Sequence, residues 1–194
     1  QSSVDGYFIL LNTINNYLAD EMKADQPDLN HEAFENAEQE VKSNIDRLLN
    51  INGSKTVDHF HRELGKIMWN ECAMSRNEKG LKQAIAQIQQ IKDEFWSDVN
   101  VTGQGDEMNT ELEKAYRLAD FIELGILMCK DALQREESCG AHFREEYQTE
   151  DGEAVRVDDD YSFVSAWEYH KGDFKLHKEQ LNFEFVNPTV RSYK

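Results

Sequence analysis

Residues 109–147 read NTELEKAYRLADFIELGILMCKDALQREESCGAHFREEY, and this stretch decides the fold. Asn109 or Thr110 is a good N-cap, and glutamates follow in the first turn, where the positive end of a helix favours carboxylates. Apolar residues then recur at helical spacing: Leu112, Ala115, Tyr116, Ala119, Ile122, Ile126, Cys129 and Leu133. Four others fill the gaps between them: Phe121, Leu124, Leu127 and Met128. We therefore expect a central helix packed on several sides, with Leu124 and Ile126 both in the core.

Four more helices are predicted upstream of residue 109. Apolar spacing places them at residues 4–22, roughly 31–51, from Thr56 to near Cys72, and from about Asn77 to Trp96. Asn30 is the expected N-cap of the second helix, and Asn52-Gly53 should stop it. Only two prolines occur in the sequence, which fits long uninterrupted helices.

The sequence changes character after Tyr147. Residues 148–160 are acidic and loop-like, and the segments SFVSAWEYH and DFKLHKEQL then alternate partly between apolar and polar residues. Lys171-Gly172 separates them, which predicts a β-hairpin because glycine accepts the positive φ of tight turns. Phe183 and Phe185 suggest a third short strand. The predicted fold is mainly α, an antiparallel helical bundle with a small C-terminal β-hairpin appendage.

Composition limits the partners of the protein. Its 194 residues carry 38 acidic and 21 basic side chains, a formal net charge of -17, which argues against nucleic acid. The three cysteines lack the spacing of a disulfide framework, so we expect reduced thiols and a cytoplasmic protein. No apolar run approaches membrane-spanning length. The sequence begins abruptly in what reads as a structural element, so we expect a fragment.

Few residues point to chemistry. His59 and His61 are two apart and should face different sides of a helix. Cys139 and His142 have loop spacing for two metal ligands or a nucleophile and base, but neither set can be completed from the sequence. Met68 and Trp69 are expected in the core. We therefore predict no catalytic, cofactor-binding or metal-binding residue in this protein.

The segment from Arg135 to Arg144 clusters two arginines, a histidine and carboxylates just beyond the central helix. One interpretation is a charge-paired helix end, which we favour slightly. The other is a direct substrate role, since an arginine can hold a dicarboxylate bidentately.

Three motifs carry a family resemblance. Residues 135–146, REESCGAHFREE, are similar to the pattern R-x-E-S-R-G-A-H-x-R-x-D in the C-terminal helical domain of succinate dehydrogenase and fumarate reductase flavoprotein subunits. The match departs at Cys139, where that family usually has arginine, and at Glu146, where it has aspartate. Residues 63–69, ELGKIMW, resemble the family's L-G-K-x-M-W, and residues 5–8, DGYF, resemble the end of its flavin domain.

The resemblance implies a parent enzyme that interconverts succinate and fumarate with FAD, beside a membrane anchor and an iron–sulfur subunit. That complex would be peripheral to the cytoplasmic face of the membrane. In the family, domains that precede this segment hold substrate and flavin, so we expect a scaffold that is inactive alone. Its candidate contacts with the iron–sulfur subunit or the flavin domain are Arg135, Glu137, Ser138, His142 and Arg144. The alternatives are an L-aspartate oxidase-like segment and a stand-alone helical interaction module.

The expected organisation has three parts. Residues 1–23 would end the flavin-domain element and form a linker helix, 24–147 the bundle, and 148–194 the loop and hairpin tail. The apolar run at residues 7–11 would pack on the flavin domain. In an isolated fragment it would instead be shielded by homodimerisation or by folding back onto the third and fifth helices.

Overall fold

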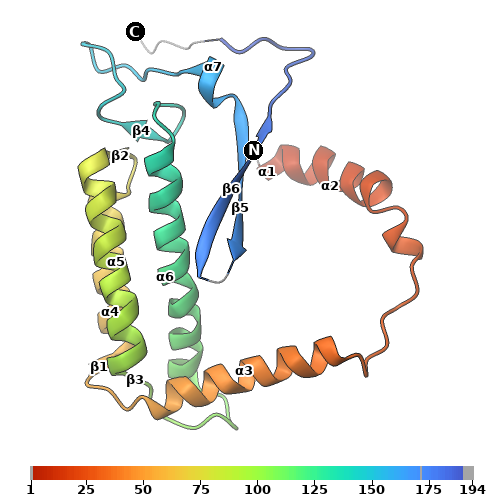
Figure 1. Ribbon diagram of the computed structural model, residues 1–194, viewed down its shortest axis with the longest axis vertical. Helices are drawn as coiled ribbons and strands as arrows, with labels where there is room; N and C mark the ends of the chain where they lie inside the picture. The colour runs from red at the N-terminus through yellow and green to blue at the C-terminus, as the bar shows by residue number, and fades with distance from the viewer. Residues whose placement is uncertain (1, 171, 190–194) are drawn as a thin grey trace. The chain divides into compact units, whose positions relative to one another are not determined.

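The computed structural model describes residues 2–170 and 172–189 (Figure 1). The protein is mainly helical and has an antiparallel hairpin near its C-terminus. It divides into two compact units, Gln1–Ser43 and Asn44–Lys194, each of which is considered by itself. In the described residues, no helix is long and apolar enough to cross a membrane.

The first unit begins with a helical stretch, as the sequence predicted. Its elements are α1 (Ser2–Val4), η1 (Asp5–Ile9), α2 (Leu10–Asn12), η2 (Thr13–Tyr17) and the short η3 (Glu21–Lys23). Two of these are π-helical, with Leu10 N–H donating to the Asp5 carbonyl and Leu18 N–H to the Thr13 carbonyl. No described side chain of this unit is buried, and the apolar run at residues 7–11 is exposed throughout.

Helix α3 (Glu32–Asn50) spans the boundary between the two units. Its predicted N-cap was wrong, because Asn30 bonds back to Asp28 while the His31 Nδ1 accepts the Ala33 amide at 3.2 Å. Phe34 and Val41 are exposed, whereas Leu48 is fully buried. Only the C-terminal part of the predicted stripe therefore enters a core.

Three helices form the body of the second unit: α4 (Val57–Glu71), α5 (Glu78–Asp98) and α6 (Thr110–Gln134). Each is N-capped by the side chain of the residue before it, since Thr56 accepts the His59 amide at 3.2 Å and Asn77 the Gly80 amide at 2.8 Å. Asn109 caps α6 by accepting two amides, those of Glu111 and Leu112. The predicted starts of these helices are confirmed.

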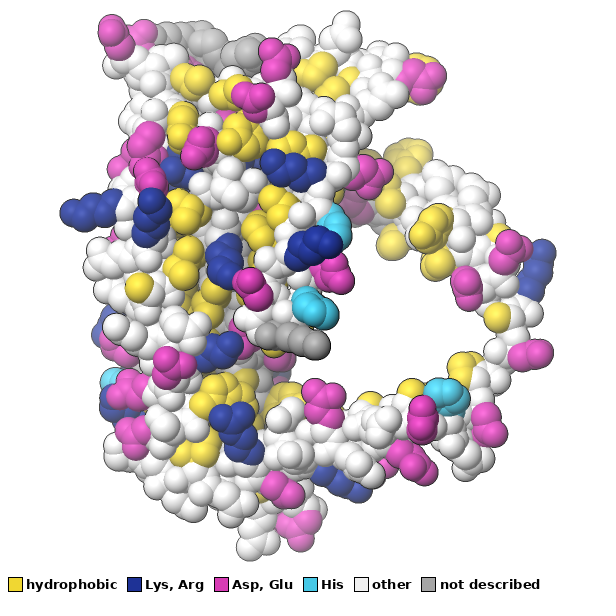
Figure 2. Space-filling view, viewed as in Figure 1, with side chains coloured by type: hydrophobic (Ala, Val, Ile, Leu, Met, Phe, Trp, Pro, Cys, Tyr) yellow, Lys and Arg dark blue, Asp and Glu magenta, His cyan; other side chains and the backbone are white. Residues whose placement is uncertain are grey.

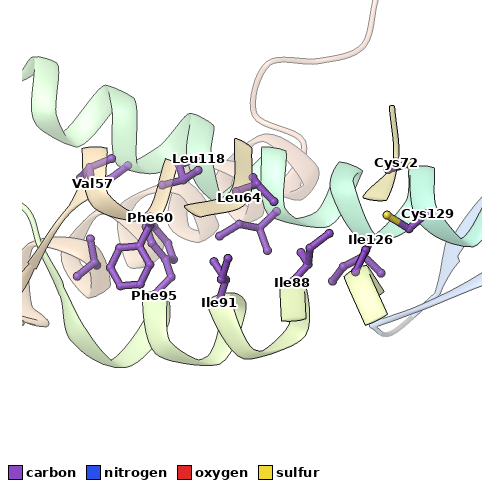
Figure 3. Packing of buried hydrophobic residues seen from close by; sticks show 14 of the residues in the cluster. Val57, Phe60, Leu64, Cys72, Ile88, Ile91, Phe95, Leu118, Ile126 and Cys129 are labelled. Atoms are coloured by element: carbon purple, nitrogen blue, oxygen red, sulfur yellow. The ribbon is translucent and has the colours of Figure 1, made fainter. Parts of the chain in front are cut away.

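The three helices share one apolar core (Figure 3). Asp58 at the start of α4 pairs with Lys114 at the start of α6, so these two helices run in the same direction. Phe60 packs edge-on against Phe95, near the end of α5, at 5.6 Å between ring centroids, so α5 runs the opposite way. On α6, Gly125 permits close packing, because a Cβ there would meet the Leu64 side chain at 3.4 Å.

The expectation that Leu124 of α6 lies in the core was wrong. Leu124 is 51% exposed, and Phe121 and Met128 lie exposed near it, while Ile122 and Ile126 are buried. The reason is that α4, α5 and the C-terminal hairpin contact other faces of α6 and leave this apolar stripe open. Trp69, also expected in the core, is 79% exposed on α4.

Short parallel strand pairs tie the second unit together. β1 (Lys55–Thr56) pairs with β3 (Val99–Asn100), and β2 (Ser75–Arg76) pairs with β4 (Phe143–Arg144). Gly53 is required beside the first pair. Its amide donates to the Val99 carbonyl at 3.0 Å, and a Cβ at this position would lie 1.9 Å from the Asp98 carbonyl.

The predicted hairpin is confirmed. β5 (Phe163–His170) pairs antiparallel with β6 (Asp173–Gln180), after a one-turn helix α7 (Asp158–Tyr161). The Trp167 indole N–H donates to Asp131 of α6 at 2.8 Å, which fixes the hairpin against that helix. Phe183 and Phe185 form no strand, so that expectation was wrong. On the face shown in Figure 2, Lys and Arg side chains are dispersed among carboxylates.

Candidate functional site

The segment 135–147 lies just beyond the C-terminal end of α6 and beside β2, the strand that follows α4 (Figure 1). It includes β4 and holds all five residues predicted to make domain or subunit contacts: Arg135, Glu137, Ser138, His142 and Arg144.

Arg144 closes the end of α6. Its side chain is 2% exposed, and its Nη1 donates to the carbonyls of Ala132 at 3.0 Å and Leu133 at 3.1 Å. The last carbonyls of a helix have no partner within the helix and carry the negative end of its dipole. The buried guanidinium donates to these carbonyls and places a positive charge at the negative end of the dipole. Arg144 therefore caps the C-terminus of α6 with a side chain from beyond the helix.

Ser138 holds the backbone of Arg144 in place. The fully buried Ser138 hydroxyl accepts the Arg144 amide at 2.9 Å and lies 3.1 Å from the Arg144 carbonyl, to which it donates. The Ser138 amide donates to Val155 at 2.8 Å. The Ser138 backbone therefore links the segment to the acidic loop that follows it, while its side chain holds Arg144.

Two glutamates connect the segment to the start of α5. Glu146 accepts the Glu78 amide and the Arg144 Nε, so its carboxylate sits at the positive end of α5. Burial raises the pKa of Glu146, but the backbone hydrogen bonds and Arg144 outweigh it and leave the pKa below its usual value. Glu145 accepts from Ser75 and Asn77, each at 2.9 Å. Glu146 thus bonds to the Glu78 amide and to Arg144, although the family pattern has aspartate at this position.

Arg135 and Glu137 bind the C-terminal tail to the helix end. The buried Glu137 carboxylate accepts the Val157 amide at 2.8 Å and pairs with Arg135. The Arg135 guanidinium donates to the carbonyls of Tyr161 at 3.3 Å and Phe163 at 3.2 Å. It also lies over the rings of these two residues, at 5.6 and 5.2 Å from their centroids.

His142 and Cys139 form the outer turn of the segment. They exchange two backbone hydrogen bonds, and Gly140 between them adopts a φ of 60°, a conformation that favours glycine. The His142 Nε2 lies 3.0 Å from the Arg135 carbonyl, which fits a neutral ring donating from that nitrogen. Burial lowers the pKa of His142, nearby arginines lower it further, and the hydrogen bond to Arg135 opposes them.

This arrangement matches the charge-paired helix end considered from the sequence. The side chains of five residues bond to backbone or side chains of the same unit: Arg135, Glu137, Ser138, His142 and Arg144. Cys139, Gly140 and Ala141 form an exposed tip. Among the described residues, no group of three side chains could hold a metal ion. His59 and His61 are both exposed on α4, and His61 lies beside Phe121 at 6.0 Å between ring centroids.

Two features of this region were missed at the level of sequence. Glu145 and Glu146 contact residues almost 70 positions away, which no local pattern indicates. The burial of Cys72 in the same apolar core as Cys129 also escaped notice, although Cys129 was correctly assigned to the buried stripe.

The fold matches part of the chains of solved quinol fumarate reductase and Sdh1 structures. The structure superposes on a variant of E. coli quinol fumarate reductase with a TM-score of 0.72 at 21% identity, over 84% of this chain and 27% of that chain. Mycobacterium smegmatis Sdh1 in complex with UQ1 gives a TM-score of 0.65 at 22% identity, over 85% and 27%.

Sequence comparison identifies the family. Residues 61–193 match the family described as "Fumarate reductase flavoprotein C-term", and the chain belongs to it. A succinate dehydrogenase flavoprotein subunit of Xenopus laevis mitochondria is 27% identical over 82% of this chain and 27% of that protein. An uncharacterised FAD-dependent oxidoreductase of Methanocaldococcus jannaschii is 33% identical over 57% of the chain and 20% of that protein. A subunit of the fumarate reductase (CoM/CoB) of Methanothermobacter marburgensis is 30% identical over 59% and 20%.

The chain spans between a fifth and about a quarter of the length of these relatives. It is the C-terminal region of a fumarate reductase or succinate dehydrogenase flavoprotein. Neither an aspartate oxidase segment nor a stand-alone interaction module is favoured by these matches.

Proposed function

We propose that the chain is the C-terminal scaffold of an FAD-dependent enzyme that interconverts succinate and fumarate. The carrying observation is the family match over residues 61–193, supported by relatives that are succinate dehydrogenase and fumarate reductase flavoprotein subunits. In this proposal, electrons pass through FAD, bound elsewhere in the parent polypeptide, to an iron–sulfur subunit. The complex is peripheral to the cytoplasmic face of the membrane.

The proposed organisation follows the three parts expected from the sequence. Residues 1–23 end the flavin-domain element and lead away from it, 24–147 form the helical bundle, and 148–194 form the loop and hairpin tail. The bundle assignment is supported by α4, α5 and α6, whose successive helices run antiparallel around one core. The tail assignment is supported by the bonds of Arg135 and Trp167, which anchor the tail on α6 and its end.

The contact with the flavin domain or iron–sulfur subunit is proposed to involve the segment after α6. Arg144, Ser138 and Glu137 hold it from inside, and Arg135 and His142 remain partly exposed beside the tip at residues 139–141. Cys139 stands in this tip where the family usually has arginine. The tip therefore offers a thiol to the partner instead of a guanidinium.

Co-purification tests this contact. Ala141→Asp places a charge at the exposed tip and should reduce recovery of the iron–sulfur subunit with the complete flavoprotein. Ala86→Asp makes the same change on the exposed face of α5 and serves as the matched control. Equal recovery from both variants would contradict the assignment of residues 139–141 to the interface.

The isolated chain is proposed to bind no FAD and to reduce no fumarate. The sequence supplies neither a phosphate-cradling glycine pattern nor the substrate residues of the preceding domains. A flavin fluorescence titration of the isolated protein should show no stoichiometric quenching, while the complete flavoprotein should retain FAD. Tight quenching by the isolated protein would refute the scaffold role.

The exposed apolar run at residues 7–11 is proposed to contact the flavin domain in the parent polypeptide and to pair two copies of the isolated chain. Phe8 and Leu10 are 66% and 55% exposed, and burial of such side chains stabilises an interface by about 1.5–3 kcal/mol each. Light scattering after size exclusion should give a dimer that is lost when Phe8→Ser and Leu10→Ser are combined. A monomer with rapid amide exchange across these residues would exclude the pairing.

A further inference from the structure

The open stripe of α6 has the residue spacing of a helix-packing seam. Phe121, Leu124 and Met128, which we call the α6 seam, are 39%, 51% and 54% exposed. Their alternating separations of three and four residues match the seam through which two helices pack side by side. Arg117 precedes the seam by four residues and Asp131 follows it by three, so the seam has a cation at one end and a carboxylate at the other.

A second feature lies beside this seam on α4. Trp69 is 79% exposed, and Gly65, one turn before it, has open space where a Cβ would project. On α4, His61 faces α6, whereas Phe60 faces α5. At 3.6 residues per turn, Gly65 and Trp69 lie next to His61 on the side away from Phe60. α4 therefore presents a projecting indole ring beside a notch at Gly65, next to α6.

The α6 seam faces away from α5, as the notch does. Phe121 contacts His61 of α4, with 6.0 Å between the ring centroids, whereas Glu123 of α6 pairs with Lys92 of α5. The seam and the notch therefore lie on one face of the unit, on the neighbouring helices α4 and α6.

The seam and the notch are also level with each other. α4 and α6 run in the same direction. A Cβ on Gly125 would meet the side chains of Leu64 and Met68, each at 3.4 Å. The middle of the seam, at residues 124–125, thus lies beside residues 64–68 of α4. The midpoint between the notch and the tryptophan falls within the same range of α4.

The α6 seam is complementary to itself when it is turned by half a turn about Leu124. Two copies of α6 that pack antiparallel about this residue bring Phe121 of one copy against Met128 of the other, and contacts between a thioether and an aromatic ring are favourable. The same pairing brings Arg117 of each copy toward Asp131 of the other, so the charges at the ends of the seam match. An interface between two identical copies requires a surface that is complementary to itself in this way.

The half-turn also suits α4. It places Trp69 of one copy over the notch at Gly65 of the other, where the absence of a side chain leaves room for the indole ring. Because the notch and the seam are level, one axis serves both contacts. α4 and α6 of the two copies then form a four-helix bundle, with α5 of each copy on the outside.

We propose that this face pairs two copies of the protein across a two-fold axis level with Leu124. The self-matching seam, the opposite charges at its ends and the notch beside Trp69 favour a second copy over an unrelated partner. The face has fewer exposed large apolar side chains than residues 7–11, so this pairing is the weaker of the two. Crosslinking therefore measures it better than chromatography does.

The test uses the complete flavoprotein with Cys139→Ser and Leu124→Cys, because a residue on a two-fold axis meets its own copy. Mild oxidation with copper phenanthroline should link two copies, and peptide mapping should find the peptide around position 124 joined to itself. Ala86→Cys in place of Leu124→Cys is the matched control, since residue 86 is exposed on α5. Trp69→Glu added to Leu124→Cys should abolish the link, and circular dichroism should show an unchanged fold, because Trp69 lies outside the core.

Reaction with a maleimide separates the alternatives. A position 124 that reacts readily with the maleimide but forms no link belongs to a solvated surface. A position 124 that is protected from the maleimide in a monomeric flavoprotein is covered by another domain. Either result, or equal links from positions 124 and 86, overturns the pairing.

Discussion

Replacing Arg144 with methionine tests the central claim about the end of α6. Methionine keeps much of the buried volume of the side chain but removes every donor that the guanidinium provides. The carbonyls of Ala132 and Leu133 then lose their partner at the point where the helix dipole is most negative. Glu146 loses its ion pair with the Arg144 Nε at 3.1 Å.

The magnitude follows from these contacts. A hydrogen bond to a charged group contributes about 1.5–3 kcal/mol, and two of them end on the carbonyls of α6 at 3.0 and 3.1 Å. The pair with Glu146 adds little, because the Glu146 side chain is 37% exposed and solvent screens it. The expected loss in the free energy of unfolding is about 3–5 kcal/mol, as for breaking other buried charged contacts.

Urea denaturation followed by circular dichroism at the helical band measures this loss. Amide exchange should quicken first in the last turn of α6 and the first turn of α5. Arg117→Met is the control, because Arg117 is an exposed arginine on the same helix and its pair with Glu113 is worth at most about 1 kcal/mol. Equal losses for the two variants would refute the role of Arg144 as a C-cap.

Three further predictions concern the core, a cap and a titrating group. Ile126→Ala should cost about 2–5 kcal/mol and Leu124→Ala less than about 1 kcal/mol, because only Ile126 is buried; similar urea midpoints would contradict the packing of α6. Asn109→Ala should destabilise by about 1–2 kcal/mol while Thr110→Ala stays nearly neutral, and the reverse order would move the N-cap by one residue. Because the pKa of His142 is below 6.5 in the folded state, the unfolded chain binds more protons as the pH falls below 6.5. The free energy of unfolding should then fall by at most about 1.4 kcal/mol per pH unit, and His142→Gln should flatten this slope in urea titrations; an unchanged slope would exclude His142 as its source.

Local chemistry explains which parts of the fold were predictable. Thr56 and Asn109 cap helices through amides two or three residues away, and Gly172 turns a hairpin between its own neighbours. These interactions are complete within a few residues, so their pattern is visible in the sequence. Asn30 is the exception among the predicted N-caps, because its backbone and side-chain amides both donate to Asp28.

Burial depends instead on how many partners a helix has. The spacing of apolar residues on α6 correctly placed Ile122 and Ile126 inside, but it could not show that α4 and α5 leave Leu124 and Met128 uncovered. For the candidate site, the charge-paired cluster was predictable from its composition. The bonds of Glu146 to the start of α5 were not, since they depend on the tertiary pairing of β2 with β4.

The bond between Glu146 and the start of α5 has a consequence for how the protein is made. The carboxylate that completes the first turn of α5 is encoded 68 residues after the amide it accepts. During synthesis α5 therefore emerges long before this partner exists, and the Glu78 amide remains open to water until α6 and the segment behind it have followed. Closure of this end of the unit is accordingly a late event in folding. In the finished protein, the bonds of Glu146 to the Glu78 amide and to Arg144 should open together, as one cooperative unit in native-state amide exchange.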